Sequence, residues 1–205
     1  MMVTISRTEL DKIREISNIG LGQAATSLSQ LLDMPCKMTV PAVTVTGFDD
    51  IIALAGGAEN EVAAISLKME GAFRATMLFI FPAAHVSSIV KQLTGEQSGI
   101  LEGIGHSALR EFGNIITGAY VATFADLTKL NVRSSIPDVV IDMAGAAITP
   151  SLLPLSLYGD DVILIQTNFN DWFEKSPERF QAQFYLLPEP GSMNVLRTAL
   201  EGMPS

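Results

Sequence analysis

Apolar side chains recur every three or four positions between Ser6 and Leu32, which is the spacing of one face of an amphipathic helix. A second helix with the same character is expected to include Ser107 to Gly118. Wound at 3.6 residues per turn, the first helix presents a single apolar side formed by Leu10, Ile13, Leu21, Ala24, Ala25, Leu28, Leu31 and Leu32. Such a helix is expected to pack on a core through that side.

Between and after these helices, apolar runs bounded by turn residues predict strands. In the first half of the chain they are Met38–Phe48, Val62–Met69 and Ala75–Phe81, and in the second Val132–Met143, Val162–Phe169 and Gln181–Leu187. Short connections between strands favour antiparallel pairing. Short helices are expected at Ala84–Leu93 and Met193–Leu200, each ending near a glycine, and loops at 56–60 and Ser151–Asp161.

Part of the sequence occurs twice, with an offset of 96 residues. Glu-Ile-Ser-Asn-Ile at 15–19 reappears as Glu-Phe-Gly-Asn-Ile at 111–115, and Pro41 has its counterpart in Pro137. A repeat of this length indicates a duplicated structural unit. No convincing linker separates the copies, so we expect one domain over 1–205, made of two internal repeats at about 6–95 and 102–203.

These patterns together predict an α/β (α+β) fold. We expect a layered domain of two pseudo-symmetric halves, each reading helix-strand-strand-strand-helix, with mostly antiparallel strands. The chain has 205 residues, of which 48% are hydrophobic and 17% charged, so it is long enough and apolar enough to bury a core.

Net charge and cysteine content exclude some classes of protein function and of cellular location. The formal net charge of −9 disfavours nucleic-acid binding, because an acidic chain repels phosphate backbones. A single cysteine, Cys36, cannot form an internal disulfide, and no signal peptide is visible, so we expect a cytoplasmic protein. The longest apolar stretches are much shorter than the ~20 residues that cross a bilayer, so no membrane insertion is expected.

The repeat places the same polar residues on both long helices. Asp11, Glu15, Asn18 and Gly22 follow one another at steps of four, three and four residues, and we call them the first polar stripe. The second polar stripe repeats those steps with Ser107, Glu111, Asn114 and Gly118. Residues three and four apart are neighbours on a helix surface, so each stripe gathers its side chains on one face.

A carboxylate and a carboxamide three residues apart can act together on one external group, and a glycine one turn later lets another protein approach closely. A single Glu-x2-Asn pair on a helix is usually a solvated face, and common ancestry alone also preserves a repeated pattern. The repeats have nevertheless diverged at Ile16/Phe112 and Ser17/Gly113, while Glu, Asn and Gly were retained. We therefore interpret both stripes as candidate functional sites.

At these residues the chain resembles the CheC/CheX/FliY family of chemotaxis phosphatases. The family pattern is Asp or Ser, three residues, Glu, two residues, Asn. Asp11, Glu15 and Asn18 match it in the first half, and Ser107, Glu111 and Asn114 match it in the second. Two intact motifs in a chain of this length resemble the CheC type within the family.

The resemblance implies hydrolysis of the aspartyl phosphate of a CheY-like response regulator. Asn18 and Asn114 would orient the attacking water, Glu15 and Glu111 would dock the partner, and Asp11 and Ser107 would support them. The protein itself would bind no metal and no cofactor, since the Mg²⁺ is expected on the response regulator. The alternative is a chemotaxis adaptor that binds a response regulator or a CheD-like receptor deamidase without turnover.

Overall fold

The eight strands of the described residues form a single sheet in which every pairing is antiparallel. The computed structural model describes residues 5–95, 103–157, 162–170 and 180–203. The strand order is β1-β7-β8-β4-β3-β5, with β2 also paired to β7 and β6 also paired to β3. The strands are β1 (Lys37–Thr39), β2 (Val43–Thr46), β3 (Glu61–Gly71), β4 (Ala75–Pro82), β5 (Val132–Ser134), β6 (Asp138–Met143), β7 (Val162–Asn170) and β8 (Phe180–Pro188).

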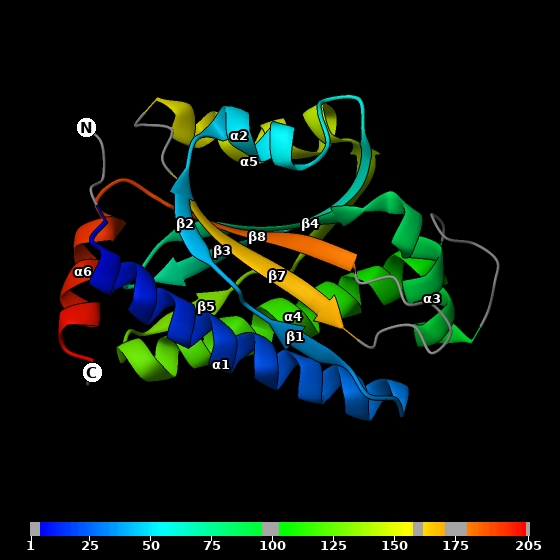
Figure 1. The fold of residues 1–205 in the computed structure, drawn as a ribbon, viewed down its shortest axis with the longest axis horizontal. Coiled ribbons are helices and arrows are strands. Elements are labelled where there is room, and N and C mark those ends of the chain that lie inside the picture. Colours follow the sequence, from blue (N-terminus) through cyan, green and yellow to red (C-terminus); the bar gives the residue numbers. More distant parts are fainter. Residues whose placement is uncertain (1–4, 96–102, 158–161, 171–179, 204–205) are drawn as a thin grey trace.

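Helices cover both faces of this sheet, which confirms the predicted α+β layering (Figure 1). The long helices α1 (Arg7–Leu32) and α4 (Ile104–Thr128) lie on one face, and α2 (Phe48–Leu54) and α5 (Ala144–Ser156) lie on the other. The short 3-10 helix η1 (Ala83–His85) leads into α3 (Val86–Thr94). Helix α6 (Ser192–Glu201) follows β8.

Two hydrophobic clusters, one on each face of the sheet, explain the apolar runs in the sequence. Along β4, Met77, Phe79 and Phe81 enter the cluster beneath α1 and α4, whereas Leu78 and Ile80 enter the cluster beneath α2 and α5. Successive side chains of a strand point to opposite faces. A strand covered on both faces therefore needs apolar residues at consecutive positions. Its sequence then lacks the alternation of polar and apolar residues that marks a strand with one face in solvent.

The predicted long strands Met38–Phe48 and Val132–Met143 were wrong, because each is two short strands. In the first half β1 and β2 both pair with β7, and in the second β5 and β6 both pair with β3. Pro41 and Pro137 lie in the two interruptions. Proline has no N–H to donate to a neighbouring strand, so the ladder is broken there.

The predicted helix-strand-strand-strand-helix order of each half was also wrong, because each half contains an additional helix. Helix α2 begins after Gly47, and helix α5 occupies much of the segment Ser151–Asp161 that was expected to be a loop; residues 158–161 lie outside the described residues. Pro150 and Pro154 lie inside α5. Burial of Ile148 and Leu152 against the sheet outweighs the cost of those prolines.

The order helix, two short strands, helix, two long strands, helix occurs twice along the chain, from α1 to α3 and from α4 to α6. The division of one domain into two internal repeats stays a prediction that this order supports. Within the described ranges, no helix combines the length and the apolar character that a membrane span requires.

Candidate functional site: two polar stripes on a helix pair

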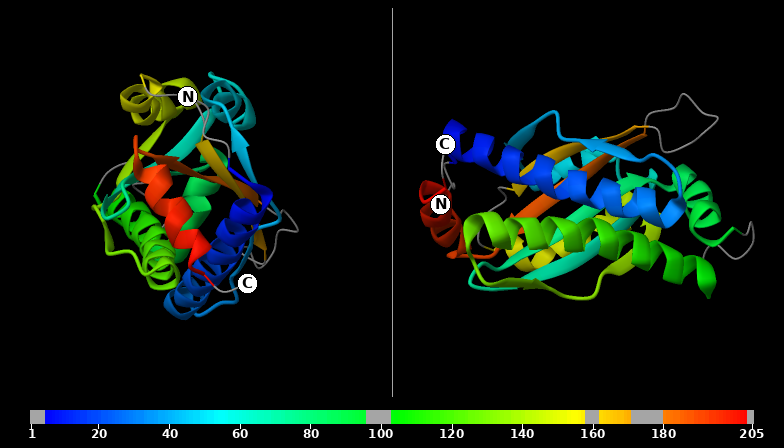
Figure 2. Two further views of the ribbon diagram at one scale, coloured as in Figure 1. Left: turned by 90° about the vertical axis from the view of Figure 1, so that its left-hand side faces the viewer. Right: turned by 90° about the horizontal axis from the view of Figure 1, so that it is seen from below.

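Helices α1 and α4 lie side by side and run in opposite directions, as the colour gradients in Figure 2 show. They pack closely where α1 carries Gly20. A Cβ atom at this glycine would lie 3.1 Å from the Tyr120 Cα and 3.3 Å from the Thr123 Cβ. Nearby, the Thr123 hydroxyl donates a 2.9 Å hydrogen bond to the Gln23 Oε1. The helix pair is therefore a rigid platform rather than two independent helices.

The structure places the whole first polar stripe on the outer face of α1. Asp11, Glu15 and Asn18 are exposed and Gly22 is half-buried. The opposite face is buried through Ile13, Ile16, Ser17, Gly20, Leu21, Ala24, Ala25 and Leu28. The helix begins at a capping box, because the Ser6 hydroxyl accepts from the Glu9 N–H (3.2 Å) and the Glu9 carboxylate accepts from the Ser6 N–H (2.6 Å).

The second polar stripe has the same exposure on α4. Ser107, Glu111 and Asn114 are exposed and Gly118 is half-buried. The buried side of α4 includes Leu109, Phe112, Ile116, Tyr120 and Phe124. The sequence-predicted site residues thus all lie on helix surfaces that face solvent.

The two stripes occupy separate regions of the helix pair. The Glu and Asn of each stripe lie in the N-terminal half of their helix, and the helices are antiparallel, so the two Glu/Asn pairs lie toward opposite ends of the helix pair (Figure 2). The structure brings Glu15 and Asn18 together on one surface, and Glu111 and Asn114 together on another. Two partner molecules would therefore meet two different ends of the platform.

The two asparagines differ in their hydrogen bonding. The Asn18 Oδ1 accepts a 3.1 Å hydrogen bond from the Val40 backbone N–H, in the connection between β1 and β2. This bond turns the Asn18 NH2 group away from Val40. Asn114 makes no hydrogen bond within the part of the chain that the structure describes, so its carboxamide is unrestrained. Sequence reasoning aligned Pro41 with Pro137 but missed Val40 as a contact, because only the fold brings it to α1.

The stripe glycines are not required by internal packing. A Cβ atom at Gly22 or Gly118 would meet nothing within 4 Å. Gly113, on the buried side of α4, differs, since a Cβ there would lie 2.6 Å from the Ile65 Cγ2. The fold thus explains why residue 113 is glycine, whereas internal packing would also accept a larger residue at positions 22 and 118.

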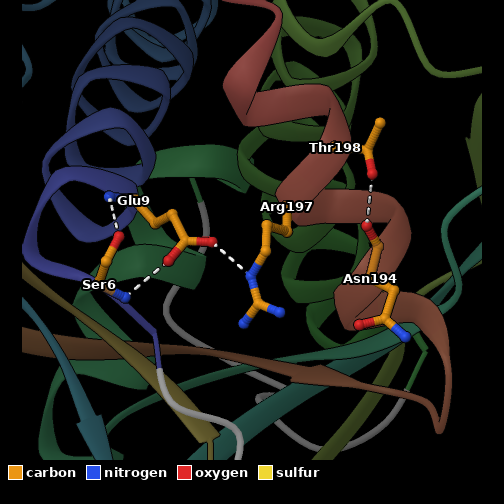
Figure 3. A network of polar contacts seen from close by, with 5 residues as sticks. All are labelled: Ser6, Glu9, Asn194, Arg197 and Thr198. Atoms are coloured by element: carbon orange, nitrogen blue, oxygen red, sulfur yellow. Dashed lines mark hydrogen bonds and ion pairs between the residues drawn. The ribbon is translucent and has the colours of Figure 1, made fainter.

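A polar cluster that sequence reasoning missed ties α6 to the start of α1 (Figure 3). The Arg197 Nε donates to the Glu9 Oε1 at 2.9 Å, while the Lys12 Nζ donates to the carbonyl oxygens of Leu200 (2.7 Å) and Met203 (3.1 Å). Burial alone would raise the pKa of Glu9, but hydrogen bonds with Ser6 and Arg197 outweigh it and lower that pKa below its ordinary value. This cluster holds the helix that carries the first stripe.

No metal centre is evident in the chain as far as it is described: none of its His, Cys, Asp and Glu residues form a group of three or more that could hold an ion. The stripes therefore offer carboxylate, carboxamide and hydroxyl groups alone. Such groups can orient a water molecule and form charge-assisted hydrogen bonds with a cationic side chain of another protein.

The fold is shared with FliY of Thermotoga maritima, whose structure superimposes with a TM-score of 0.75 at 21% identity, covering 97% of this chain and 98% of that one. The fold is thus that of the structural class that includes this FliY. In sequence, the CheY-P phosphatase CheC of Bacillus subtilis (strain 168) is 36% identical over 201 residues, covering 96% of this chain and 95% of its own. The flagellar motor switch phosphatase FliY of the same organism is 26% identical over 171 residues, 81% of this chain and 43% of that protein.

The model of the CheC-like family matches residues 9–45 and 104–141. Each matched segment contains one complete polar stripe. The chain belongs to the CheC-like family, which confirms the resemblance stated from the sequence.

Proposed function

We propose that this protein is a phosphatase that hydrolyses the aspartyl phosphate of a CheY-like response regulator, at one site on α1 and another on α4. The observation that carries the proposal is the exposure of both complete Glu/Asn stripes within the two segments that match the CheC-like family model. The B. subtilis relative, similar over nearly its whole length, is a CheY-P phosphatase.

The asparagines are the groups on which hydrolysis depends. A carboxamide both donates and accepts hydrogen bonds, so Asn18 or Asn114 can hold a water in line with the phosphorus. Phosphoryl transfer has a loose transition state, and catalysis consists mainly of positioning and electrostatic stabilisation. The Mg²⁺ that neutralises the phosphoryl oxygens belongs to the response regulator, which is the substrate.

The other stripe residues bind and support the partner. Glu15 and Glu111 form charge-assisted pairs with a lysine of the response regulator, three residues from the asparagine on the same helix face. Asp11 and Ser107 lie one turn earlier and support the docked partner. Gly22 and Gly118 leave open space one turn later, into which the response regulator's active-site loops fit.

The test is the decay of the phosphoryl group of the organism's CheY-like protein, with this protein present at a catalytic ratio. We expect many turnovers per molecule. Asn18→Asp combined with Asn114→Asp keeps the side-chain size and the acceptor for the Val40 N–H but removes both NH2 groups. Loss of water orientation costs about 10²-fold in rate.

Two results would contradict the proposal. Unchanged turnover in the double variant, with unchanged circular dichroism, would show that the asparagines do not orient the water. Binding of the response regulator without accelerated decay would favour the alternative, an adaptor that sequesters a response regulator or a CheD-like receptor deamidase. Gln30→Glu, at an exposed amide of α1 outside the stripe, is the control for the negative charge that Asn→Asp adds.

A further inference from the structure

Val40 and Ile136 occupy the same position in the two repeats. They are 96 residues apart, each precedes a proline, and each lies between two short strands that pair with one long strand. The segment that follows each long helix returns along the outer side of that helix (Figure 2). These connections therefore flank the two polar stripes.

The two side chains lie in different environments. Val40 is only 5% exposed, because its side chain joins the core and its N–H donates to Asn18. Ile136 is 79% exposed although its neighbours Pro137 and Val139 are buried. The rest of this connection is anchored, but an aliphatic side chain as exposed as Ile136 contributes no burial to the stability of its own chain.

Contacts on β3 place Ile136 beside the second stripe. Gly113, next to Asn114, lies against Ile65, and Ile65 pairs with Val139 of β6. Three residues further along β3, Lys68 exchanges hydrogen bonds with Ser135: the Lys68 N–H donates to the Ser135 Oγ, and the Ser135 N–H donates to the Lys68 carbonyl oxygen. The connection that carries Ile136 is thus fixed to β3 next to α4, in the repeat position that Val40 holds against Asn18 in the first half.

We propose that Ile136 is a docking residue for the response regulator at the second site, with no counterpart at the first. This proposal rests on the proposed function and extends it to partner binding. The occupant is the response regulator, because its active-site loops must cover Asn114 and the flank beside it. An apolar side chain at the rim of the polar stripe is then buried only in the complex.

The consequence is that the two sites bind the partner differently. At the first site the equivalent position, Val40, is already buried in the protein core. At the second site Ile136 adds apolar contact to the Glu111 pairing. Substitution of Ile136 therefore raises the KM of the second site and leaves its kcat, because Asn114 still orients the water.

The experiment measures steady-state dephosphorylation by Ile136→Ser in two backgrounds. In Asn18→Ala only the second site works, and the KM rises about tenfold, as expected for exposing instead of burying one isoleucine. In Asn114→Ala only the first site works, and the rise is much smaller. Ile136→Leu restores the KM in the first background, since an aliphatic side chain is present again.

Leu153→Ser is the matched control, an exposed apolar residue (61%) on α5, on the opposite face of the sheet. An unchanged KM for Ile136→Ser in the Asn18→Ala background, or an equal rise for Leu153→Ser, would overturn the docking role while both single-site enzymes still turn over. Failure of the proposed function is a separate result, namely full turnover by the double asparagine variant. The two outcomes are therefore distinguishable.

Discussion

Gly113 and Gly118 lie five residues apart on α4. Replacing each by alanine is expected to change the unfolding free energy in opposite directions. Gly118 faces open space, so Gly118→Ala gains only helix propensity, about 1 kcal/mol. Gly113→Ala gains the same term, but its Cβ would lie 2.6 Å from Ile65, which is fully buried between sheet and helix. Inserting a methyl group into a packed core costs about 1–3 kcal/mol.

The gain in helix propensity is the same for both variants, so it cancels when their unfolding free energies are compared. Gly118→Ala is therefore expected to exceed Gly113→Ala in unfolding free energy by about 1–3 kcal/mol. In a chain of this size each kcal/mol changes Tm by about 2–4 °C. The measurement is urea denaturation of both variants and the unchanged protein, followed by circular dichroism, with thermal melting as a second readout.

The same pair tests the role of the stripe glycine. Gly118→Ala in an Asn18→Ala background is expected to be more stable and yet slower in dephosphorylation, because the added methyl group occupies space that the partner needs. Equal stability of the two alanine variants would refute the packing argument at Gly113. A stabilised Gly118→Ala with unchanged turnover would refute close approach of the partner at that turn.

The cluster between α1 and α6 supports two further predictions. Lys12→Met removes hydrogen bonds to two carbonyl oxygens at the end of α6, where a cation also favours the helix dipole; we expect a loss of about 1–2 kcal/mol in urea denaturation. An unchanged midpoint would show that Lys12 does not anchor α6. The folded-state pKa of Glu9 lies below its ordinary value of 4.5, so the stability gained from its ionised form is present above that value and lost as the pH falls through the lower pKa. The unfolding free energy of the unchanged protein should therefore exceed that of Glu9→Gln by more at pH 7 than at pH 3, and a difference independent of pH would contradict this linkage.

Local signals in the sequence were sufficient for the elements that position the site. The 3.6-residue periodicity and the repeated Glu-x2-Asn spacing predicted the extent of α1 and which residues share its outer face, and the structure agrees. Helix periodicity depends on backbone geometry alone, so a stripe can be read without knowledge of the packing. The predicted roles of the stripe residues stay predictions that the proposed experiments test.

Local signals failed where long-range contacts outweigh them. Neither α2 nor α5 was predicted, since Met38–Phe48 was expected to be a strand and Ser151–Asp161 a loop. Burial beneath the sheet nevertheless stabilises both helices, although α5 contains two prolines. A proline or glycine penalty is a local quantity of a few kcal/mol, and hydrophobic burial of a helix face can exceed it. The residues against which such a helix is buried are distant in sequence, so a local sequence pattern does not reveal them.

The sequence by itself determined the repeat, the antiparallel α+β class, the two polar stripes and the family resemblance, because each rests on residue identity at a fixed spacing. Only the tertiary structure decided how the two stripes differ. Val40 and Ile136 are equivalent in sequence, yet Val40 is buried and donates its N–H to Asn18, whereas Ile136 is exposed. Burial depends on which strands and helices surround a residue, and that arrangement exists only once the chain is folded.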